Sequence, residues 1–343
     1  MRLAIVGNPG GTNVGESLLR AATQQSIPTQ FLDATAAYRA WRPLQAFCWR
    51  FLDRRPARMR PFSNDVVKQC RDFRPDVLIA TGQVPISADD LKELNGQKIV
   101  TVNYSTDDPW SPNHRAKWFL RALPEYRLVF TPRTANVADL QRIGCHHVEY
   151  LPFGYDPTMW YPDTATNQIP ADILFVGGGD DDRGPILTAL AEAGLKLAIY
   201  GSYWDRYPAL RPFIRGQVGP DEIRRVSSVA ALALILVRRA NRDEHVMRSF
   251  EAAAMKSCLL VEDTPEHRAI FGHDGENVCY FQSTNNLILR AKELLANPSE
   301  RNRLAAASYD IMVAGQHTYT DRFGRMMAVA ANVRALQYGH NDE

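Results

Sequence analysis

A chain of 343 residues is longer than one hydrophobic core comfortably supports, and it suits two domains of ordinary size. Its hydrophobic content of 45% and charged content of 23% are those of a globular protein in water. The net charge of +2 gives little attraction to polyanions and excludes a protein dedicated to binding nucleic acid.

The chain opens with a predicted strand at residues 3–6, a glycine-rich turn and a helix that begins near Val14. Gly10 and Gly11 lie in this turn, where small residues let backbone N–H groups approach an anion at the start of the following helix. The spacing matches neither the dinucleotide-binding fingerprint nor the P-loop. The turn is therefore either a phosphate-binding loop or a tight turn without a ligand.

Residues 38–62 are the most unusual segment, with seven arginines and one aspartate interleaved with aromatic side chains. Apolar residues at a spacing of three or four, from Trp41 to Phe51, predict an amphipathic helix that begins near Pro43 and ends at Pro56. Two interpretations stay open. The apolar stripe packs on the N-terminal sheet, as in most amphipathic helices, or the segment meets a membrane, a lipid-linked acceptor or an anionic acceptor.

Short apolar or β-branched runs predict further strands, and helical segments separate them, as in a doubly wound parallel sheet. In this half of the chain the further predicted strands are residues 29–32, 76–80, 98–102 and 128–131. A helix is predicted at residues 63–73, with Ser63 as its N-cap and with Val66, Val67 and Cys70 facing inward.

Asp107 and Asp108 follow the strand at residues 98–102, within the sequence YSTDDPW. A carboxylate beyond the carboxyl end of a strand can act as a general base or position an acceptor hydroxyl. The alternative is an Asx turn ahead of Pro109, without a catalytic role.

Residues 151–170 contain four prolines and little periodicity, and they are predicted to link two domains. A strand at residues 172–176 then runs into the sequence GGGDDDRGP. The glycines of this loop, Gly178 among them, can surround a diphosphate, and Arg183 can offer it a fork of donors. We expect the three aspartates at residues 180–182 to turn outward.

Residues 232–263 are predicted to form a β-α-β unit, because apolar runs at 232–237 and 258–261 flank a helix at 246–255. In such sheets ligands bind beyond the carboxyl ends of the strands, where this segment carries the polar sequence RRANRDEH. Asp243 lies before the helix and Glu251 inside it, with seven residues between them. The alternative is that Glu251 is an ordinary polar residue on a helix that covers the sheet.

This spacing resembles the acidic-x7-acidic motif of retaining glycosyltransferases of the GT-B fold, in which the first acid is usually glutamate rather than aspartate. The strings RSFEAAAMKSCLLVED, GHDGENVCYF and HTYTDRF, together with the Asp-Asp-Pro sequence at 107–109, resemble the CgeB-like (spore maturation protein) glycosyltransferases more specifically. The resemblance covers roughly residues 76–330.

The resemblance implies an α/β protein of the GT-B fold, with two doubly wound, Rossmann-like domains that face each other across a cleft. The implied domains are residues 1–155 on the acceptor side, residues 156–318 for the nucleotide sugar, and a helix at 319–343 that packs back on the first domain. The implied function is transfer of a sugar from a nucleotide-diphosphate sugar to an acceptor hydroxyl in glycan or glycoconjugate biosynthesis. Two alternatives stay open, a related nucleotide-sugar epimerase and a non-catalytic nucleotide-sugar-binding protein.

The resemblance also implies roles for single residues. Glu251 would hold the ribose of the nucleotide and Asp243 would contact the donor sugar, whereas Asp107 or Asp108 would contact the acceptor or act as base. The full set of implied nucleotide-sugar-binding residues is Gly10, Gly11, Gly178, Arg183, Tyr200, Arg242, Arg248 and Glu251.

No cofactor and no metal are expected, because the eight histidines show no metal-ligand spacing. The expected partners are the nucleotide-diphosphate sugar and a glycan, lipid-linked or small-molecule acceptor. We expect a cytoplasmic location, since no apolar run reaches the ~20 residues of a membrane-spanning helix. The start MRLAIVGN also shows no signal region, and the five cysteines form no C-x-x-C pair. A peripheral contact of residues 38–62 with the inner face of the membrane follows from the second interpretation of that segment.

Overall fold

The computed structural model describes residues 1–164 and 171–338, and the chain forms two compact units. Unit 1 contains Met1–Pro152, Ala240–Arg242 and the chain from Tyr319 onward, and unit 2 contains Phe153–Arg239 and Asp243–Thr318. Residues 165–170, which end the predicted linker, and residues 339–343 lie outside the described residues.

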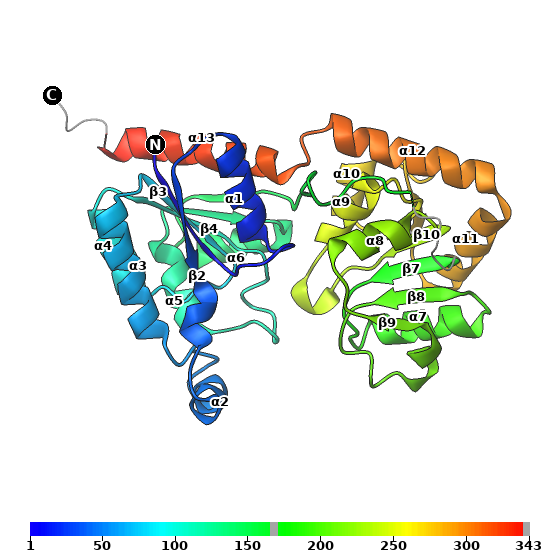
Figure 1. Ribbon diagram of the computed structural model, residues 1–343, viewed down its shortest axis with the longest axis horizontal. Helices are drawn as coiled ribbons and strands as arrows, with labels where there is room; N and C mark the ends of the chain where they lie inside the picture. The colour runs from blue at the N-terminus through cyan, green and yellow to red at the C-terminus, as the bar shows by residue number, and fades with distance from the viewer. Residues whose placement is uncertain (165–170, 339–343) are drawn as a thin grey trace. The chain divides into compact units, whose positions relative to one another are not determined.

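The described part of unit 1 contains a sheet of six parallel strands in the order β2-β1-β3-β4-β5-β6 (Figure 1). The strands are β1 (Leu3–Gly7), β2 (Thr29–Asp33), β3 (Val77–Thr81), β4 (Val100–Tyr104), β5 (Leu128–Thr131) and β6 (Val148–Tyr150). In register, Leu3 of β1 lies opposite Thr29 of β2 and Val77 of β3. The strands β1, β3, β4 and β5 are buried along almost their whole length, because helices cover both faces of the sheet.

Helices pack on both faces of this sheet. The helices in the described part of unit 1 are α1 (Val14–Gln24), η1 (Ala34–Tyr38), α2 (Arg42–Phe51), α3 (Met59–Phe73), α4 (Ala88–Gly96), α5 (Lys117–Ala122), η2 (Leu123–Glu125), α6 (Thr134–Arg142) and α13 (Tyr319–Tyr338). On one face α3, α4 and α5 contribute Val66, Leu91 and Phe119 to a core with the strands. Helix α13 packs against α1 and β4 (Figure 1), and its residues Phe323 and Met326 are fully buried.

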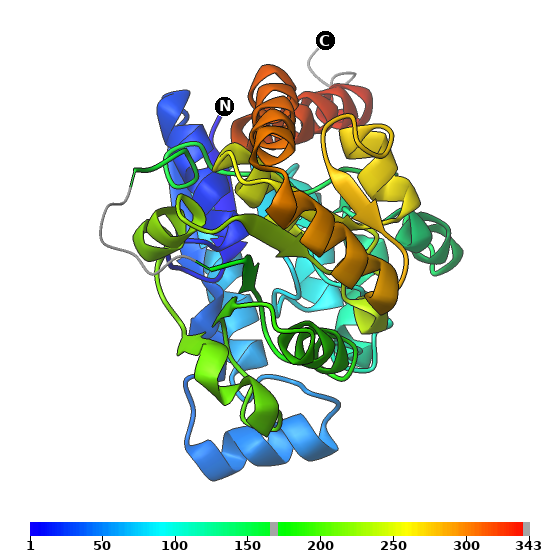
Figure 2. The same ribbon diagram turned by 90° about the vertical axis from the view of Figure 1, so that its right-hand side faces the viewer.

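The described part of unit 2 contains a second sheet of six parallel strands, in the order β12-β11-β10-β7-β8-β9. The strands are β7 (Ile173–Val176), β8 (Leu197–Tyr200), β9 (Ile214–Gly216), β10 (Leu232–Ile235), β11 (Leu259–Glu262) and β12 (Cys279–Phe281). The helices are α7 (Arg183–Glu192), η3 (Pro208–Phe213), α8 (Pro220–Ser227), α9 (Met247–Ala254), α10 (Pro265–Phe271), α11 (Thr284–Ala296) and α12 (Pro298–Ala314), with the short turn η4 (Arg239–Asn241) after β10. Leu187 and Leu190 of α7 share one core with Leu287 and Leu294 of α11, and Figure 2 shows both helices beside the sheet.

Each sheet has a point at which the order of the strands reverses. In unit 1 the chain passes from β1 to β2 on one side and then returns to place β3 on the other side of β1. In unit 2 it passes from β7 through β8 and β9, and then places β10 on the other side of β7. Ligands of doubly wound sheets bind at such switch points, beyond the carboxyl ends of the two strands. The loops after β1, β3, β7 and β10 are therefore the first places to examine.

Two local predictions are wrong. Ser63 is not an N-cap, because α3 begins four residues earlier at Met59 and holds Ser63 in its buried interior. Its hydroxyl bonds to the Asp90 carboxylate and accepts from the Ser87 backbone N–H at 2.8 Å, so it ties α3 to the start of α4.

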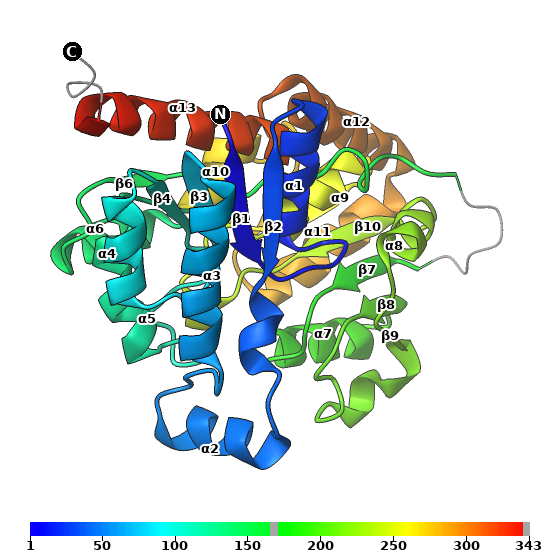
Figure 3. The same ribbon diagram turned by 60° about the vertical axis from the view of Figure 1, so that its left-hand side comes forward.

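The apolar stripe from Trp41 to Phe51 does not pack on the sheet. Residues 38–62 run from the end of η1 through α2 into the start of α3, and α2 lies beyond the end of α3 in Figure 3. Cys48 of α2 is buried, whereas Leu44, Phe47 and Phe51 are exposed. The interpretation that placed this stripe in the N-terminal core is therefore wrong. None of the helices within the described ranges has the length and apolar character that crossing a bilayer requires.

Candidate functional site

In unit 2 the glycine-rich loop after β7 packs closely on the loop after β8. The Gly177 N–H donates to the Tyr200 carbonyl and the Gly179 N–H donates to the Ser202 carbonyl, both at 2.8 Å. A Cβ atom on Gly179 would lie 2.6 Å from the Tyr203 carbonyl oxygen, so a larger residue does not fit there. Gly178 lies between these two bonded glycines. The loop is thus held in place by backbone contacts, as a loop that presents N–H groups to an anion must be.

Arg183 begins α7 and is buried. Its guanidinium donates to the Leu236 carbonyl at 3.1 Å and lies 5.7 Å from the centre of the Phe175 ring. Burial lowers its pKa, and the nearby Asp180 carboxylate opposes that shift. Arg183 therefore joins the loops after β7 and β10, the two loops of the switch point. Its predicted contact with phosphate stays a prediction.

The three aspartates of this loop differ in their exposure and in their hydrogen bonds. The Asp180 carboxylate accepts from the backbone N–H groups of Asp182 at 3.1 Å and Arg183 at 2.8 Å, so it caps the start of α7. Asp181 and Asp182 are exposed. The expectation that all three turn outward holds for these two and is wrong for Asp180.

The loop after β10 is closed by an ion pair between the half-buried Arg238 and the buried Asp243. Arg238 Nε donates to Asp243 Oδ2 at 2.8 Å, and the Asp243 N–H donates to the Arg238 carbonyl at 3.2 Å. Asp243 is 4% exposed. At the end of the neighbouring strand β11, Glu262 accepts from the Val237 N–H at 3.1 Å and from Arg239 at 2.7 Å. Two ion pairs, Arg238 with Asp243 and Arg239 with Glu262, thus lie beyond the ends of β10 and β11.

Glu251 lies inside α9 and is 2% exposed. Its carboxylate pairs with Arg248, with 2.8 Å between Oε2 and Nη1. Burial raises the pKa of Glu251, and Arg248 opposes that shift. The Arg248 guanidinium in turn lies 5.0 Å from the centre of the Trp160 ring. A carboxylate that is charged at neutral pH in such a place costs free energy unless donors bind it.

Two buried histidines, His245 and His267, hold α9 in position through hydrogen bonds. His245 Nδ1 lies 2.6 Å from the Glu266 carboxylate, and His245 Nε2 accepts from the Phe153 N–H at 3.2 Å. His267 Nδ1 donates to the Glu262 carbonyl at 2.8 Å, so its Nε2 accepts from the Ser249 hydroxyl at 2.8 Å. Burial lowers the pKa of His267 to about 3, which keeps it neutral. These bonds set the position of α9 and therefore of Glu251.

In unit 1 the loop after β1 carries Gly10 and Gly11, and both are exposed. Gly10 has a φ of +108°, which favours glycine, and its N–H donates to Glu16 at 3.4 Å. The Gly11 carbonyl accepts from Arg20 at 2.9 Å. The loop is thus tied to α1, at the switch point beside β3.

Asp107 and Asp108 differ sharply in their surroundings. Asp108 is 1% exposed and its two carboxylate oxygens accept from Arg242 at 2.6 and 3.0 Å. It also accepts from the Trp110 N–H at 3.0 Å, which is the Asx turn named as the alternative. Asp107 is partly exposed, and its carboxylate lies 3.7 Å from His114 Nε2. The structure therefore assigns Asp108 to an internal network and leaves Asp107 accessible.

Arg242 belongs to unit 1, together with Ala240 and Asn241. Besides Asp108 its guanidinium binds Asp139 at 2.7 Å, and these bonds raise its pKa. Its φ of +49° is uncommon for a residue with a side chain. Arg242 is thus saturated by carboxylates of unit 1, whereas Arg183, Arg248 and Glu251 lie in unit 2. Tyr200, at the end of β8, is also in unit 2 and is buried.

Two residues near these groups were not predicted as site residues, whereas Arg238 was predicted within the polar sequence RRANRDEH that follows the strand. Trp160 lies in the proline-rich linker, and Tyr203 is 77% exposed beside Gly178. No sequence pattern marks the last two, because only the folded chain brings them to the loop or to Arg248. Within the described ranges no cluster of three or more His, Cys, Asp and Glu side chains is placed to hold a metal ion.

A family model described as glycosyl transferase-like matches residues 183–328. This span holds Arg183, Arg248 and Glu251. No curated protein matches the chain. The match supports the glycosyltransferase predicted from the sequence.

Solved structures with a similar fold cover both units. A sucrose-phosphate synthase from Thermosynechococcus elongatus has a TM-score of 0.70 and 13% identity, over 98% of this chain and 100% of the other. HepE from Anabaena, in complex with UDP and glucose, has a TM-score of 0.65 and 11% identity, over 97% and 99%. A protein described as a UDP-N-acetylglucosamine 2-epimerase, from Listeria monocytogenes, has a TM-score of 0.54 and 12% identity, over 100% and 98%. At these identities the likeness concerns the fold, and it confirms the predicted GT-B fold.

Proposed function

We propose that the chain is a glycosyltransferase that transfers a sugar from a nucleotide-diphosphate sugar to an acceptor hydroxyl. The observation that carries the proposal is Glu251, a buried carboxylate with a raised pKa at the switch-point side of unit 2. It lies inside the segment that matches the glycosyl transferase-like family. The hydroxyl groups of a ribose are donors from which such a carboxylate accepts hydrogen bonds. UDP is the first nucleotide to test, because HepE, which shares the fold, is described in complex with UDP and glucose.

The donor-side roles are proposed for residues of unit 2. Glu251 holds the ribose and Arg248 keeps the Glu251 side chain in place through the 2.8 Å ion pair. Backbone N–H groups around Gly178 and the guanidinium of Arg183 meet the diphosphate. Asp243 contacts the donor sugar, and Tyr200 lines the loop that carries Gly177 through its carbonyl bond.

The negative charge that develops on the leaving diphosphate needs stabilisation in the transition state. Fixed cations and backbone N–H groups provide it without reorganisation, and this is usually the largest catalytic term. Arg183, which the neighbouring carbonyls hold in place, is the proposed residue for this step. We propose that no metal or cofactor takes part.

The acceptor-side roles are proposed for unit 1. Asp107 acts as the base or positions the acceptor hydroxyl, because its carboxylate is accessible and that of Asp108 is not. Asp108 and Arg242 are positioning residues that hold the segment next to Asp107. The Gly10–Gly11 loop contacts donor phosphate or acceptor.

The acceptor is proposed to be a glycan, a lipid-linked sugar or a small molecule, and the family is proposed to be the CgeB-like branch on the strings quoted from the sequence. A cytoplasmic location with peripheral contact to the membrane through residues 38–62 belongs to the same proposal. Such a contact favours a lipid-linked acceptor among the three.

A second candidate function is nucleotide-sugar epimerisation. The observation in its favour is the shared fold with the Listeria monocytogenes protein described as a 2-epimerase. The products separate the two, because a transferase releases a nucleoside diphosphate and an epimerase returns an isomeric nucleotide sugar.

Calorimetric titration with UDP tests the proposal in the wild-type chain and in the Glu251→Gln variant. A hydrogen bond to a charged group contributes ~1.5–3 kcal/mol, so the affinity should fall about tenfold or more. Glu192→Gln, an exposed change on α7 that touches no proposed contact, is the matched control and should keep wild-type affinity. Equal affinity of Glu251→Gln and the control would return Glu251 to the role of an ordinary buried side chain.

A further inference from the structure

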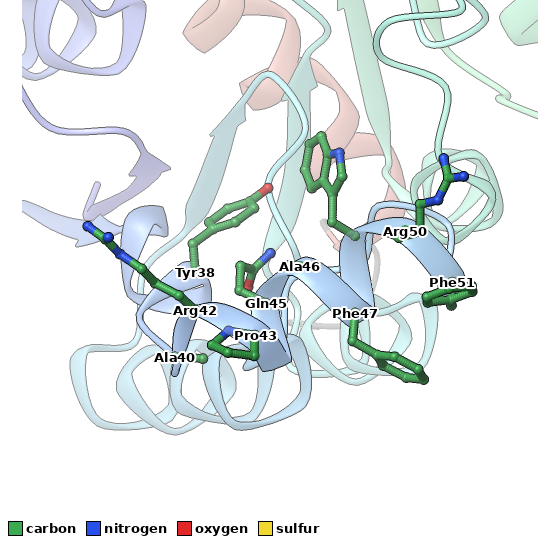
Figure 4. A pocket seen from close by; sticks show the side chains of 10 residues that line it. Tyr38, Ala40, Arg42, Pro43, Gln45, Ala46, Phe47, Arg50 and Phe51 are labelled. Carbon is green, nitrogen blue, oxygen red and sulfur yellow. The ribbon is translucent and has the colours of Figure 1, made fainter.

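Helix α2 presents an apolar face that stays exposed among the described residues. Trp41 is 76% exposed, Phe47 53% and Phe51 69%. Phe47 and Phe51 are one helical turn apart and their ring centres are 5.1 Å apart, so they form one continuous surface (Figure 4). Leu44 lies on the same side of α2, because it precedes Phe47 by three residues and Phe51 by seven. Clusters of exposed aromatic residues of this kind mark binding surfaces on proteins that are otherwise well packed.

Arginines border this surface without partners for their charge. Arg42 and Arg50 of α2, and Arg58 and Arg60 just beyond it, are all exposed. None of the four forms an ion pair with another residue in the described ranges. Other arginines of unit 1 pair with acids, as Arg242 does with Asp108 and Arg39 with Asp33. The surface is therefore positively charged as well as apolar.

Hydrogen bonds hold α2 in place, although most of its side chains are exposed. The Arg58 N–H donates to the Ala37 carbonyl at 3.0 Å, and this bond joins the two ends of the segment that carries α2. The Ala57 N–H donates to the Gln45 side chain at 3.0 Å. Polar bonds rather than apolar packing thus fix α2 in this orientation.

Arg54 supplies a further brace. It donates to the Pro112 carbonyl at 2.6 Å and to the Arg115 carbonyl at 3.1 Å, and Asp53 beside it accepts from the Lys117 N–H. The side chains of these two charged residues are bonded to backbone groups of unit 1. They are therefore separate from the arginines that border the apolar face.

Tyr38 and α2 also enclose a groove of about 1080 Å³, lined by Arg42, Phe47 and Arg50 among others (Figure 4). The groove places apolar walls directly beside two guanidinium groups. A phospholipid offers the matching chemistry, because its acyl chains are apolar and its phosphate is anionic. Arginine binds phosphate through paired donors.

We propose that α2 is an interfacial anchor that lays Trp41, Leu44, Phe47 and Phe51 into the surface of an anionic lipid bilayer. Arg42, Arg50, Arg58 and Arg60 then contact lipid phosphates at the same surface. Helices of this type combine an aromatic and aliphatic face with arginines, and their binding depends on anionic lipid and on salt. The inference does not rest on the proposed transferase activity, since membrane binding is measured without substrate.

The experiment is flotation of the full chain with vesicles of phosphatidylcholine alone and with 30% phosphatidylglycerol, a composition of roughly the charge of a bacterial or cytoplasmic leaflet. Wild type should float with the anionic vesicles at low salt, bind the neutral vesicles weakly, and leave the anionic ones at about 0.5 M salt, where screening is strong. The variant Trp41→Ser/Phe47→Ser/Phe51→Ser should lower the bound fraction by about tenfold or more.

Two further variants make the outcome specific. Leu289→Ser/Val313→Ser removes exposed apolar side chains from α11 and α12 of unit 2 and should bind like wild type. Arg42→Gln/Arg50→Gln should lower binding to anionic vesicles while leaving the weak binding to neutral ones. Arg54 stays unchanged in every variant, because it braces the segment. Near-native circular dichroism confirms folding.

Two results would overturn the inference. In one, wild type remains unbound on anionic vesicles at low salt. In the other, sedimentation velocity shows a dimer that the triple serine variant converts to monomer, while vesicle binding is absent, and the face is then an interface between two copies of the chain.

Discussion

Asp107 and Asp108 illustrate what single residues contribute and what a sequence hides. Both follow a predicted strand, and both have the chemistry of a base. They differ because Arg242, which lies 134 positions further along the chain than Asp108, neutralises one and not the other. No local pattern predicts such a partner. The same limit applies to Arg183, whose predicted phosphate-binding guanidinium is buried against the Leu236 carbonyl.

The two aspartates should therefore respond differently to removal of charge. Asp107→Asn should fold normally and lose about 10²–10⁴-fold in the rate of UDP release from UDP-glucose in the presence of acceptor, as expected for loss of a base. Asp108→Asn should instead lower the free energy of unfolding by about 2 kcal/mol or more, because it leaves Arg242 without its buried partner. Turnover and urea unfolding of both variants measure these effects. Full activity in Asp107→Asn would remove that residue from the mechanism.

At the scale of elements, strands were predictable where burial on both faces makes them continuous apolar runs. The runs at β1, β5 and β10 are examples. The ends of β5 are as predicted, and those of β1 and β10 differ by a residue or two because hydrogen bonding decides where a strand stops. The strands β6 and β9 were missed, since each is three residues long, lies at an edge and is only partly buried. The helix at α2 was predicted, but the choice between a core-facing and an exposed apolar stripe was left open, because amphipathic spacing is the same for a core face and a membrane face.

Helix α9 gives a prediction on pH. The folded-state pKa of His267 is about 3, and the unfolded value is about 6.5, so below pH 6.5 the unfolded chain binds a proton that the folded one does not. Stability should therefore fall as pH drops from 6.5, by up to about 2 kcal/mol at pH 5 from this residue. His267→Gln should be less stable at pH 7 but lose less between pH 6.5 and 5 in urea unfolding. His146→Gln, which is exposed, serves as control, and an unchanged pH slope in His267→Gln would contradict this role.

At the scale of the whole molecule, two doubly wound sheets each bring glycine-rich and charged loops to a switch point. The repeated alternation of strands and helices made this fold class predictable from sequence. The chemistry that distinguishes a transferase from an epimerase on the same fold depends on single side chains, and the roles of Asp243 and Glu251 stay predictions. The fold brings Asp243 to Arg238 and Glu251 to Arg248 and Trp160, and these contacts give the proposed donor site its charge pattern.

Amide hydrogen exchange with and without saturating UDP tests the central claim most directly, because it locates the nucleotide along the chain. The predicted result is slower exchange in the presence of UDP at residues 177–183, in the loop from 237 to 245, and in α9 around Glu251. The same measurement with GDP, ADP and dTDP identifies the bound nucleotide if one of them slows exchange more than UDP does. If none of the four nucleoside diphosphates slows exchange in these segments, the proposed donor site, and with it the proposed transfer reaction, is contradicted.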